Sequence, residues 1–85
     1  ELRLAIDAEL VVFGSTDRHT HVTIQGEPVQ VNADGGFAIK MHLPDRRQVI
    51  PIVASSSDGV DQKTVVLGVE RNTKMLDPKT GDRPS

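Results

Sequence analysis

Apolar and polar side chains alternate with a period of two residues along most of this sequence. The cleanest run is Phe37, Ile39, Met41 and Leu43, which alternate with Ala38, Lys40 and His42. Side chains of a strand point alternately to its two faces, so this period predicts strands with one face in a core. Valine and isoleucine dominate the apolar residues, and such β-branched side chains favour a pleated, half-buried surface.

Turn-forming residues separate the alternating runs. They occur at residues 14–17, 26–28, 33–36, 44–47 and 55–59. This spacing predicts six or seven short antiparallel strands, arranged as a sandwich or a small closed sheet. The predicted inward-facing residues are Leu10, Val12, Val22, Ile24, Phe37, Ile39, Ile50, Ile52, Leu67 and Val69. Leu2, Leu4 and Ile6 keep the same period and indicate a first strand, although residues 2–9 also fit a helical turn.

The segment Asp34-Gly35-Gly36 admits three interpretations. A phosphate-binding loop needs its glycines to lead into a helix, whereas residues 37–43 have the pattern of a strand. A calcium loop of the helix-loop-helix type needs several spaced carboxylates, and only Asp34 is present. We therefore predict a hairpin turn, in which glycine supplies a positive φ.

Length and composition narrow the range of functions. With 85 residues the chain forms a single domain, which we assign to residues 1–73, followed by a flexible polar tail or linker at 74–85. The chain begins with Glu1 rather than Met, which indicates a piece of a longer protein. No apolar run approaches the roughly 18 residues that a membrane helix needs. The absence of cysteine excludes disulfides and thiolate chemistry.

Charge and aromatic content argue against two classes of ligand. Ten basic and 12 acidic side chains are interspersed along the sequence, without the clustered basic excess of a nucleic-acid-binding protein. The only aromatic residues of the Phe, Trp and Tyr type are two phenylalanines. Sugars and single-stranded nucleic acids usually stack on exposed aromatic rings, so a platform for them is not predicted. We predict no cofactor and no contact with nucleic acid or membrane.

Two sets of side chains are candidate metal ligands. His19 and His21 lie two residues apart and share one face of a strand, where Asp17 or His42 would supply a third ligand for zinc or nickel. The alternative is a pair of solvent-facing histidines beside a sheet edge. A second set of carboxylates, at strand ends and loops, is a candidate for calcium or for ordinary turn chemistry: Asp7, Glu9, Asp17, Asp58 and Asp61.

Catalytic constellations are not recognisable. Ser55, Ser56 and Ser57 precede Asp-Gly and have the composition of a loop, without a nucleophile elbow. The pair Arg46-Arg47 is a weak patch for an acidic partner. Arg71 is expected to pair with a neighbouring carboxylate. We therefore predict that the chain is not an enzyme.

Several segments resemble bacterial immunoglobulin-like modules. They are ELVVFG (9–14), HVTIQGEPVQV (21–31), DGGFAIKMHLPD (34–45) and QVIPIVASSSDG (48–59). More closely, the chain is similar to the C-terminal region of bacterial proteins catalogued as a domain of unknown function. That likeness lies in the Leu-Pro-Asp…Gln-Val-Ile-Pro segment and in Val-Glu-Arg-Asn-Thr at residues 69–73. The Cys, Trp and Cys of antibody-type domains are absent.

The resemblance implies an immunoglobulin-like β-sandwich of about seven short antiparallel strands and an accessory module without catalytic residues. We therefore predict a non-catalytic structural or protein-interaction module, acting as a spacer between flanking domains of its parent protein. Its exposed sheet edges would allow homo-oligomerisation by strand addition. The alternative is an accessory module that binds a polysaccharide or a loop-bound metal ion such as calcium.

Overall fold

The structure is a computed structural model, and it describes residues 2–76. All regular secondary structure in this part of the chain is β-strand: β1 (Glu9–Ser15), β2 (His21–Ile24), β3 (Glu27–Val29), β4 (Gly36–His42), β5 (Arg47–Ser55) and β6 (Gln62–Glu70). The prediction of an all-β chain is thus confirmed, with six strands rather than about seven. No helix in the described residues is long and apolar enough to cross a membrane.

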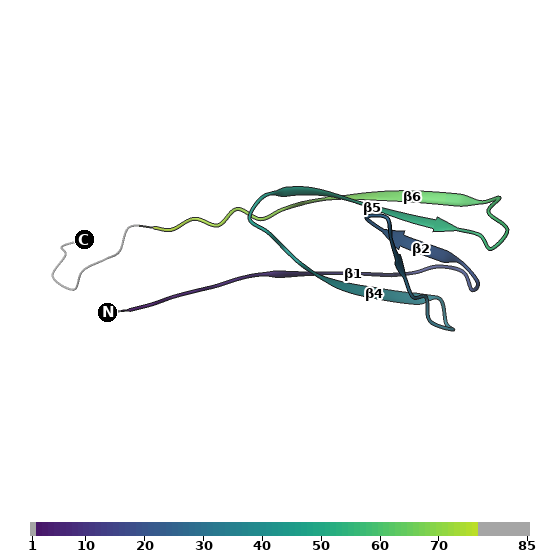
Figure 1. The fold of residues 1–85 in the computed structure, drawn as a ribbon, viewed down its shortest axis with the longest axis horizontal. Helices are drawn as coiled ribbons and strands as arrows, with labels where there is room; N and C mark the ends of the chain where they lie inside the picture. The colour runs from purple at the N-terminus through teal and green to yellow at the C-terminus, as the bar shows by residue number, and fades with distance from the viewer. Residues whose placement is uncertain (1, 77–85) are drawn as a thin grey trace.

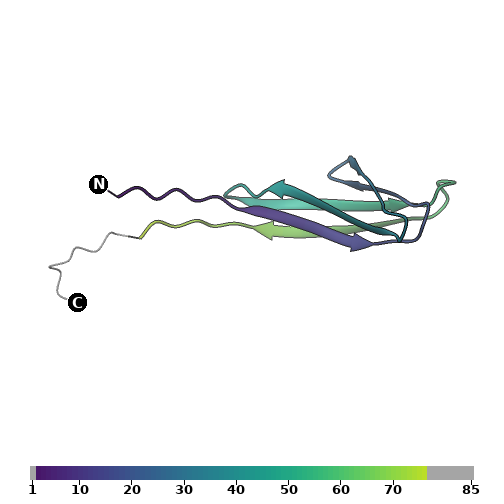
Figure 2. The ribbon, with the colours of Figure 1, turned by 90° about the horizontal axis from the view of Figure 1, so that it is seen from below.

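The strands form two antiparallel sheets (Figures 1 and 2). One sheet contains β1 and β4, and the other has the order β3-β2-β5-β6. Two hairpins, β2–β3 and β5–β6, join strands within a sheet, whereas the chain changes sheet between β1 and β2, β3 and β4, and β4 and β5. This arrangement is consistent with a β-sandwich, in which each sheet buries one face against the other.

The core lies where the inward faces of the two sheets meet. Its buried residues are Val12, Val22, Ile24 and Ile50, and ten further apolar residues are packed against them: Leu10, Val29, Val31, Phe37, Ile39, Met41, Ile52, Ala54, Leu67 and Val69. All ten residues that the alternation predicts as inward-facing belong to this cluster. The period of two therefore located the core correctly on every strand that it predicted within residues 10–69.

The predicted first strand at Leu2, Leu4 and Ile6 is not formed. These residues are 94%, 87% and 66% exposed, and residues 2–6 belong to an extended segment that leaves the sheets and forms no strand (Figure 1). The reason is that this segment runs directly into β1 without a turn, so it cannot fold back beside it. Within the described chain no other strand lies next to it.

The segment Asp34-Gly35-Gly36 forms the predicted turn, in which the Asn32 N–H donates to the Gly36 carbonyl at 2.8 Å, but the strands on its two sides do not pair as a hairpin. The flanking strands β3 and β4 belong to different sheets, since β3 pairs with β2 and β4 pairs with β1. The two-residue connection Gln25-Gly26 makes β3 pair with β2. The turn at residues 34–36 therefore carries the chain from one sheet to the other. Gly35 has the expected positive φ, 91°, whereas the φ of Gly36 lies outside this region.

The molecule is elongated, with principal extents of 68 × 22 × 19 Å. Residues 2–8 and 71–76 leave the sheets at the same end, which we call the base (Figures 1 and 2). The opposite end, which we call the tip, carries the loops 16–20, 30–35 and 56–61. The predicted tail at 74–85 lies mostly outside the described residues.

Candidate functional site

The predicted histidine site lies at the tip. His21 begins β2, opposite Ser55 of β5, and His19 lies in the preceding turn with a left-handed backbone, φ 61°. His19, His21 and Asp17 are all exposed, and no three His, Asp or Glu side chains in residues 2–76 gather closely enough to hold a metal ion. His42, considered as a third ligand, lies at the base, at the far end of β4. Histidine adopts the left-handed backbone conformation more often than most residues, so the turn itself explains a histidine at position 19.

A shallow groove of about 690 Å³ runs beside these histidines. Its lining comes from the β1–β2 loop, the β2–β3 hairpin and residues 30–33. Arg18 is among the lining residues and donates a hydrogen bond from Nε to the Ala33 carbonyl oxygen, 3.1 Å away. The arginine thereby joins two tip loops, so its guanidinium has a structural partner already.

The acidic loop between β5 and β6 is an internally bonded turn. Ser56 Oγ donates to Asp58 Oδ1 at 2.6 Å, and the Val60 backbone N–H donates to the same oxygen at 3.0 Å. The Asp61 backbone N–H in turn donates to Ser56 Oγ. The bonds that Asp58 accepts from the Ser56 hydroxyl, the largest cause, and from the Val60 N–H lower its pKa. The Asp58 oxygen and the Ser56 hydroxyl are thus both used within the loop.

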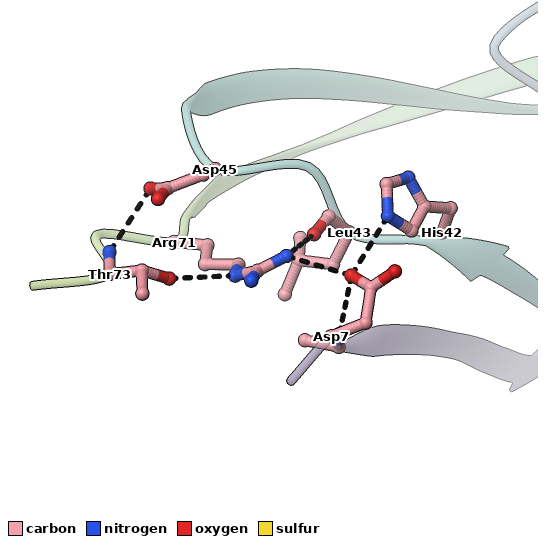
Figure 3. Close-up of polar contacts among 7 residues, drawn as sticks. Asp7, His42, Leu43, Asp45, Arg71 and Thr73 are labelled. Carbon is pink, nitrogen blue, oxygen red and sulfur yellow. Dashed lines mark hydrogen bonds and ion pairs between the residues drawn. The ribbon is translucent and has the colours of Figure 1, made fainter. Parts of the chain in front are cut away.

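The base holds a second polar cluster, drawn in Figure 3. Asp7 Oδ1 accepts hydrogen bonds from the Ala8 backbone N–H at 2.8 Å and from Arg71 Nη1 at 3.0 Å, and it lies 3.0 Å from His42 Nε2. Asp7 lies two residues before β1, and Arg71, 64 residues later in the chain, directly follows β6. The expectation that Arg71 pairs with a carboxylate is confirmed.

Arg71 is the centre of this cluster, with its side chain only 16% exposed. Nη1 also donates to the Leu43 carbonyl oxygen at 2.7 Å, and Nε donates to Thr73 Oγ1 at 3.0 Å. The backbone N–H of Thr73 donates to Asp45 Oδ1 at 3.1 Å, and that of Arg71 donates to the Arg46 carbonyl oxygen. We call the set Asp7, His42, Leu43, Asp45, Arg71 and Thr73 the base clasp.

The base clasp gives a physical role to two sequence motifs. Leu43-Pro44-Asp45 and the segment ending Arg71-Asn72-Thr73 stand out in the sequence as motifs, and here they bond to each other. Sequence reasoning missed Asp7 as the third component, because its only signal is an acidic residue shortly before a strand. Arginine suits this position, since its fork of donors reaches several oxygens at once.

The hydrogen bonds that Asp7 accepts make the stability of the fold depend on pH in the acid range. Its pKa is lowered from the ordinary value of 3.8, chiefly by the Ala8 backbone N–H, then by His42 and Arg71. A carboxylate whose folded pKa is lowered stabilises the fold above its unfolded pKa, and this contribution is lost as pH falls through the folded pKa. Asp7 and His42 line a depression in the surface, and Glu9 is the third ionisable residue in its lining.

We expect Asp7→Asn to lower the stability at neutral pH and to make stability fall less steeply in acid. The measurement is the midpoint of urea unfolding between about pH 6 and about pH 2 for both proteins. Part of the acid dependence remains in the variant, because the pKa of Asp58 is lowered as well. Equal slopes below the ordinary pKa of 3.8 for the two proteins would contradict this role of Asp7.

The edge of β1 that faces away from β4 has no partner strand in the described chain. The Leu43 N–H bonds to the Ala8 carbonyl, and the Thr16 N–H bonds to the Gly35 carbonyl. Because backbone groups alternate between the two edges of a strand, the even-numbered residues of β1 face β4. The N–H and C=O groups of Glu9, Val11, Phe13 and Ser15 consequently point to the open edge.

No protein-family model matches this chain, and neither a curated protein nor a solved structure matches it.

Proposed function

We propose that this chain is a non-catalytic structural and protein-interaction module, built as an immunoglobulin-like sandwich and carried as a projecting arm. The observation that carries the proposal is the base clasp, which holds the entry and the exit of the domain together. A module held in this way presents its tip loops and sheet edges to neighbours while both connections leave at one end.

The strand order supports the immunoglobulin-like assignment. In that fold the second and fifth strands, B and E, pair in one sheet, and C, F and G pair in the other. The pairs β1-β4 and β2-β5-β6 have the same order along the chain, with β3 extending the second sheet beside β2. Strand A, which precedes B and lies beside it, has no counterpart among the described residues.

The geometry changes the expected mode of action. A spacer between two flanking domains holds them apart best when its ends leave from opposite sides. Here Asp7 and Arg71 are in direct contact, so two flanking segments would be brought together rather than separated. The length of the sheets then sets how far the tip projects beyond the two connections, which leave the base as extended segments (Figure 1).

Insertion into a surface loop of an unrelated, stable host protein tests the arm. We expect residues 2–76, inserted through short flexible linkers, to leave the melting temperature of the host nearly unchanged and to unfold in a transition of their own. A host protein tolerates an inserted domain best when the two ends of that domain lie close together. A matched control inserts the same residues with Asp7→Asn and Arg71→Met, which removes the clasp and should disturb the host more. A host that is equally destabilised by both inserts would contradict the proposal.

A further inference from the structure

If the chain acts as the interaction module proposed above, one of its sheet edges must bind a partner. We propose that the open edge of β1 binds residues 2–8 of a second copy of this chain, so that two copies exchange these segments around a two-fold axis at Ala8. Within residues 2–76 the structure supplies both halves of such an interface: an acceptor edge and an extended donor segment, neither of which has a partner strand.

The donor segment has the pattern of a strand that lacks a sheet. Leu2, Leu4 and Ile6 alternate with Arg3, Ala5 and Asp7, and all three apolar side chains are more than half exposed. Exposed apolar side chains at a strand period are uncommon in a segment meant for solvent. The seven residues 2–8 also match the seven residues of β1 in length.

The acceptor side has uncovered apolar surface in the matching place. On β6, Val65 faces inward, because it pairs with Ile52 of the core, yet it is 57% exposed. The contact of Asp7 with Arg71 places the start of β1 beside the end of β6. A strand added along β1 would therefore lie over the inward face of β6 and cover it.

One antiparallel register gives favourable side-chain pairs on both the inward and the outer face of the paired strands. With Ala8 opposite Ala8, the inward-facing pairs are Leu2 with Gly14, Leu4 with Val12, and Ile6 with Leu10. On the outer face Arg3 stands opposite Phe13, a ring that is 77% exposed in the single chain and gains a cation as its neighbour. The odd-numbered backbone groups of the donor meet those of β1, so the ladder of hydrogen bonds is complete.

The pairing of Arg3 with Phe13 favours the axis at Ala8 over its nearest alternatives. With the axis moved by one residue, to Asp7 or to Glu9, Arg3 stands opposite Val11 or Ser15 instead of Phe13. With the axis at Ala8, Asp7 stands opposite Glu9 in both halves of the dimer, and Arg71 and His42, which bind the Asp7 carboxylate, offset this like-charge pairing.

The buried area fits a dimer that dissociates on dilution. Full burial of one Leu or Ile side chain removes on the order of 60–120 Å² of apolar surface from water. The two donors and the surface they cover then bury about 1,000 Å² in total, at the lower limit for a specific interface. Light scattering should accordingly show a dimer at high protein concentration and a monomer at low concentration.

Cysteine cross-linking tests the register, and the chain is suited to it because it has no cysteine of its own. Under mild oxidation Ala8→Cys should form a covalent dimer, since residues opposite each other in a non-hydrogen-bonded pair approach closely enough for a disulfide. Two matched controls, Ala5→Cys and Ala38→Cys, should cross-link at least about tenfold more slowly, because neither residue meets its own copy in this register.

Leu4→Asp provides the second arm of the test. Leu4 is 87% exposed in the single chain, so its replacement should leave the melting temperature of the monomer unchanged while abolishing the dimer and the Ala8→Cys cross-link. A wild-type chain that stays monomeric at millimolar concentration, or a ladder of higher oligomers, overturns the inference. Either result leaves the insertion experiment unaffected, so failure of the exchange is distinguishable from failure of the arm.

Discussion

Gly35→Ala is expected to lower the free energy of unfolding by about 3 kcal/mol or more. Gly35 has a φ of 91°, where a side chain is strained, and an added Cβ would overlap the carbonyl oxygen of Thr16. Relief of that overlap must separate the two loops, which breaks the 2.8 Å hydrogen bond from Thr16 N–H to the Gly35 carbonyl. A chain of 85 residues has on the order of 5–10 kcal/mol of stability in all, so the loss is a large fraction.

Substitutions at two other glycines separate the cost of backbone strain from the cost of the steric overlap. Gly26 also has a positive φ, 80°, but an added Cβ would meet nothing within 4 Å, so Gly26→Ala should cost about 1 kcal/mol from strain alone. An added Cβ at Gly36 approaches only the movable carboxylate of Asp34, at 3.2 Å, and Gly36→Ala should have the smallest effect. Urea unfolding at constant m-value measures all three. Equal losses for Gly35 and Gly36 would contradict the turn geometry.

The same turn shows how far local sequence reasoning reaches. Asp34-Gly35-Gly36 indicates a chain reversal, because the side chain of Asp and the freedom of Gly act within three or four residues. Indeed Asp34 Oδ1 accepts the Gly36 N–H at 2.9 Å. Which strands the reversal joins depends on pairing partners elsewhere in the chain. For that reason the turn was predictable from the sequence, whereas the pairing of the strands on its two sides was not.

The base clasp illustrates the opposite limit. Asp7, Leu43 and Arg71 are separated by 28 to 64 residues, and nothing local to any of them indicates the others. By contrast, the core residues were predictable because each strand reports its own inward face through alternation. Alternation also placed Leu2, Leu4 and Ile6 in a strand, and none of the six strands described in the same chain lies beside them. In the proposed dimer, β1 of a second copy is their partner.

Ile50→Ala is expected to be the most destabilising single change in the core, at about 4 kcal/mol. Ile50 is fully buried, and it lies on β5, which is flanked on both sides by strands of its sheet. Only three other side chains among the described residues are buried apolar ones, so little of the core can move in to fill the cavity.

The neighbouring residue on the same strand provides the control. Val49 points to the outer face and is 63% exposed, so Val49→Ala should cost less than about 1 kcal/mol, from strand preference alone. Ile50→Val, which removes one methyl group, should fall between the two at about 1 kcal/mol. A similar loss for Val49→Ala and Ile50→Ala would mean that β5 is shifted by one residue. Every assignment of a face in the four-stranded sheet would then be reversed.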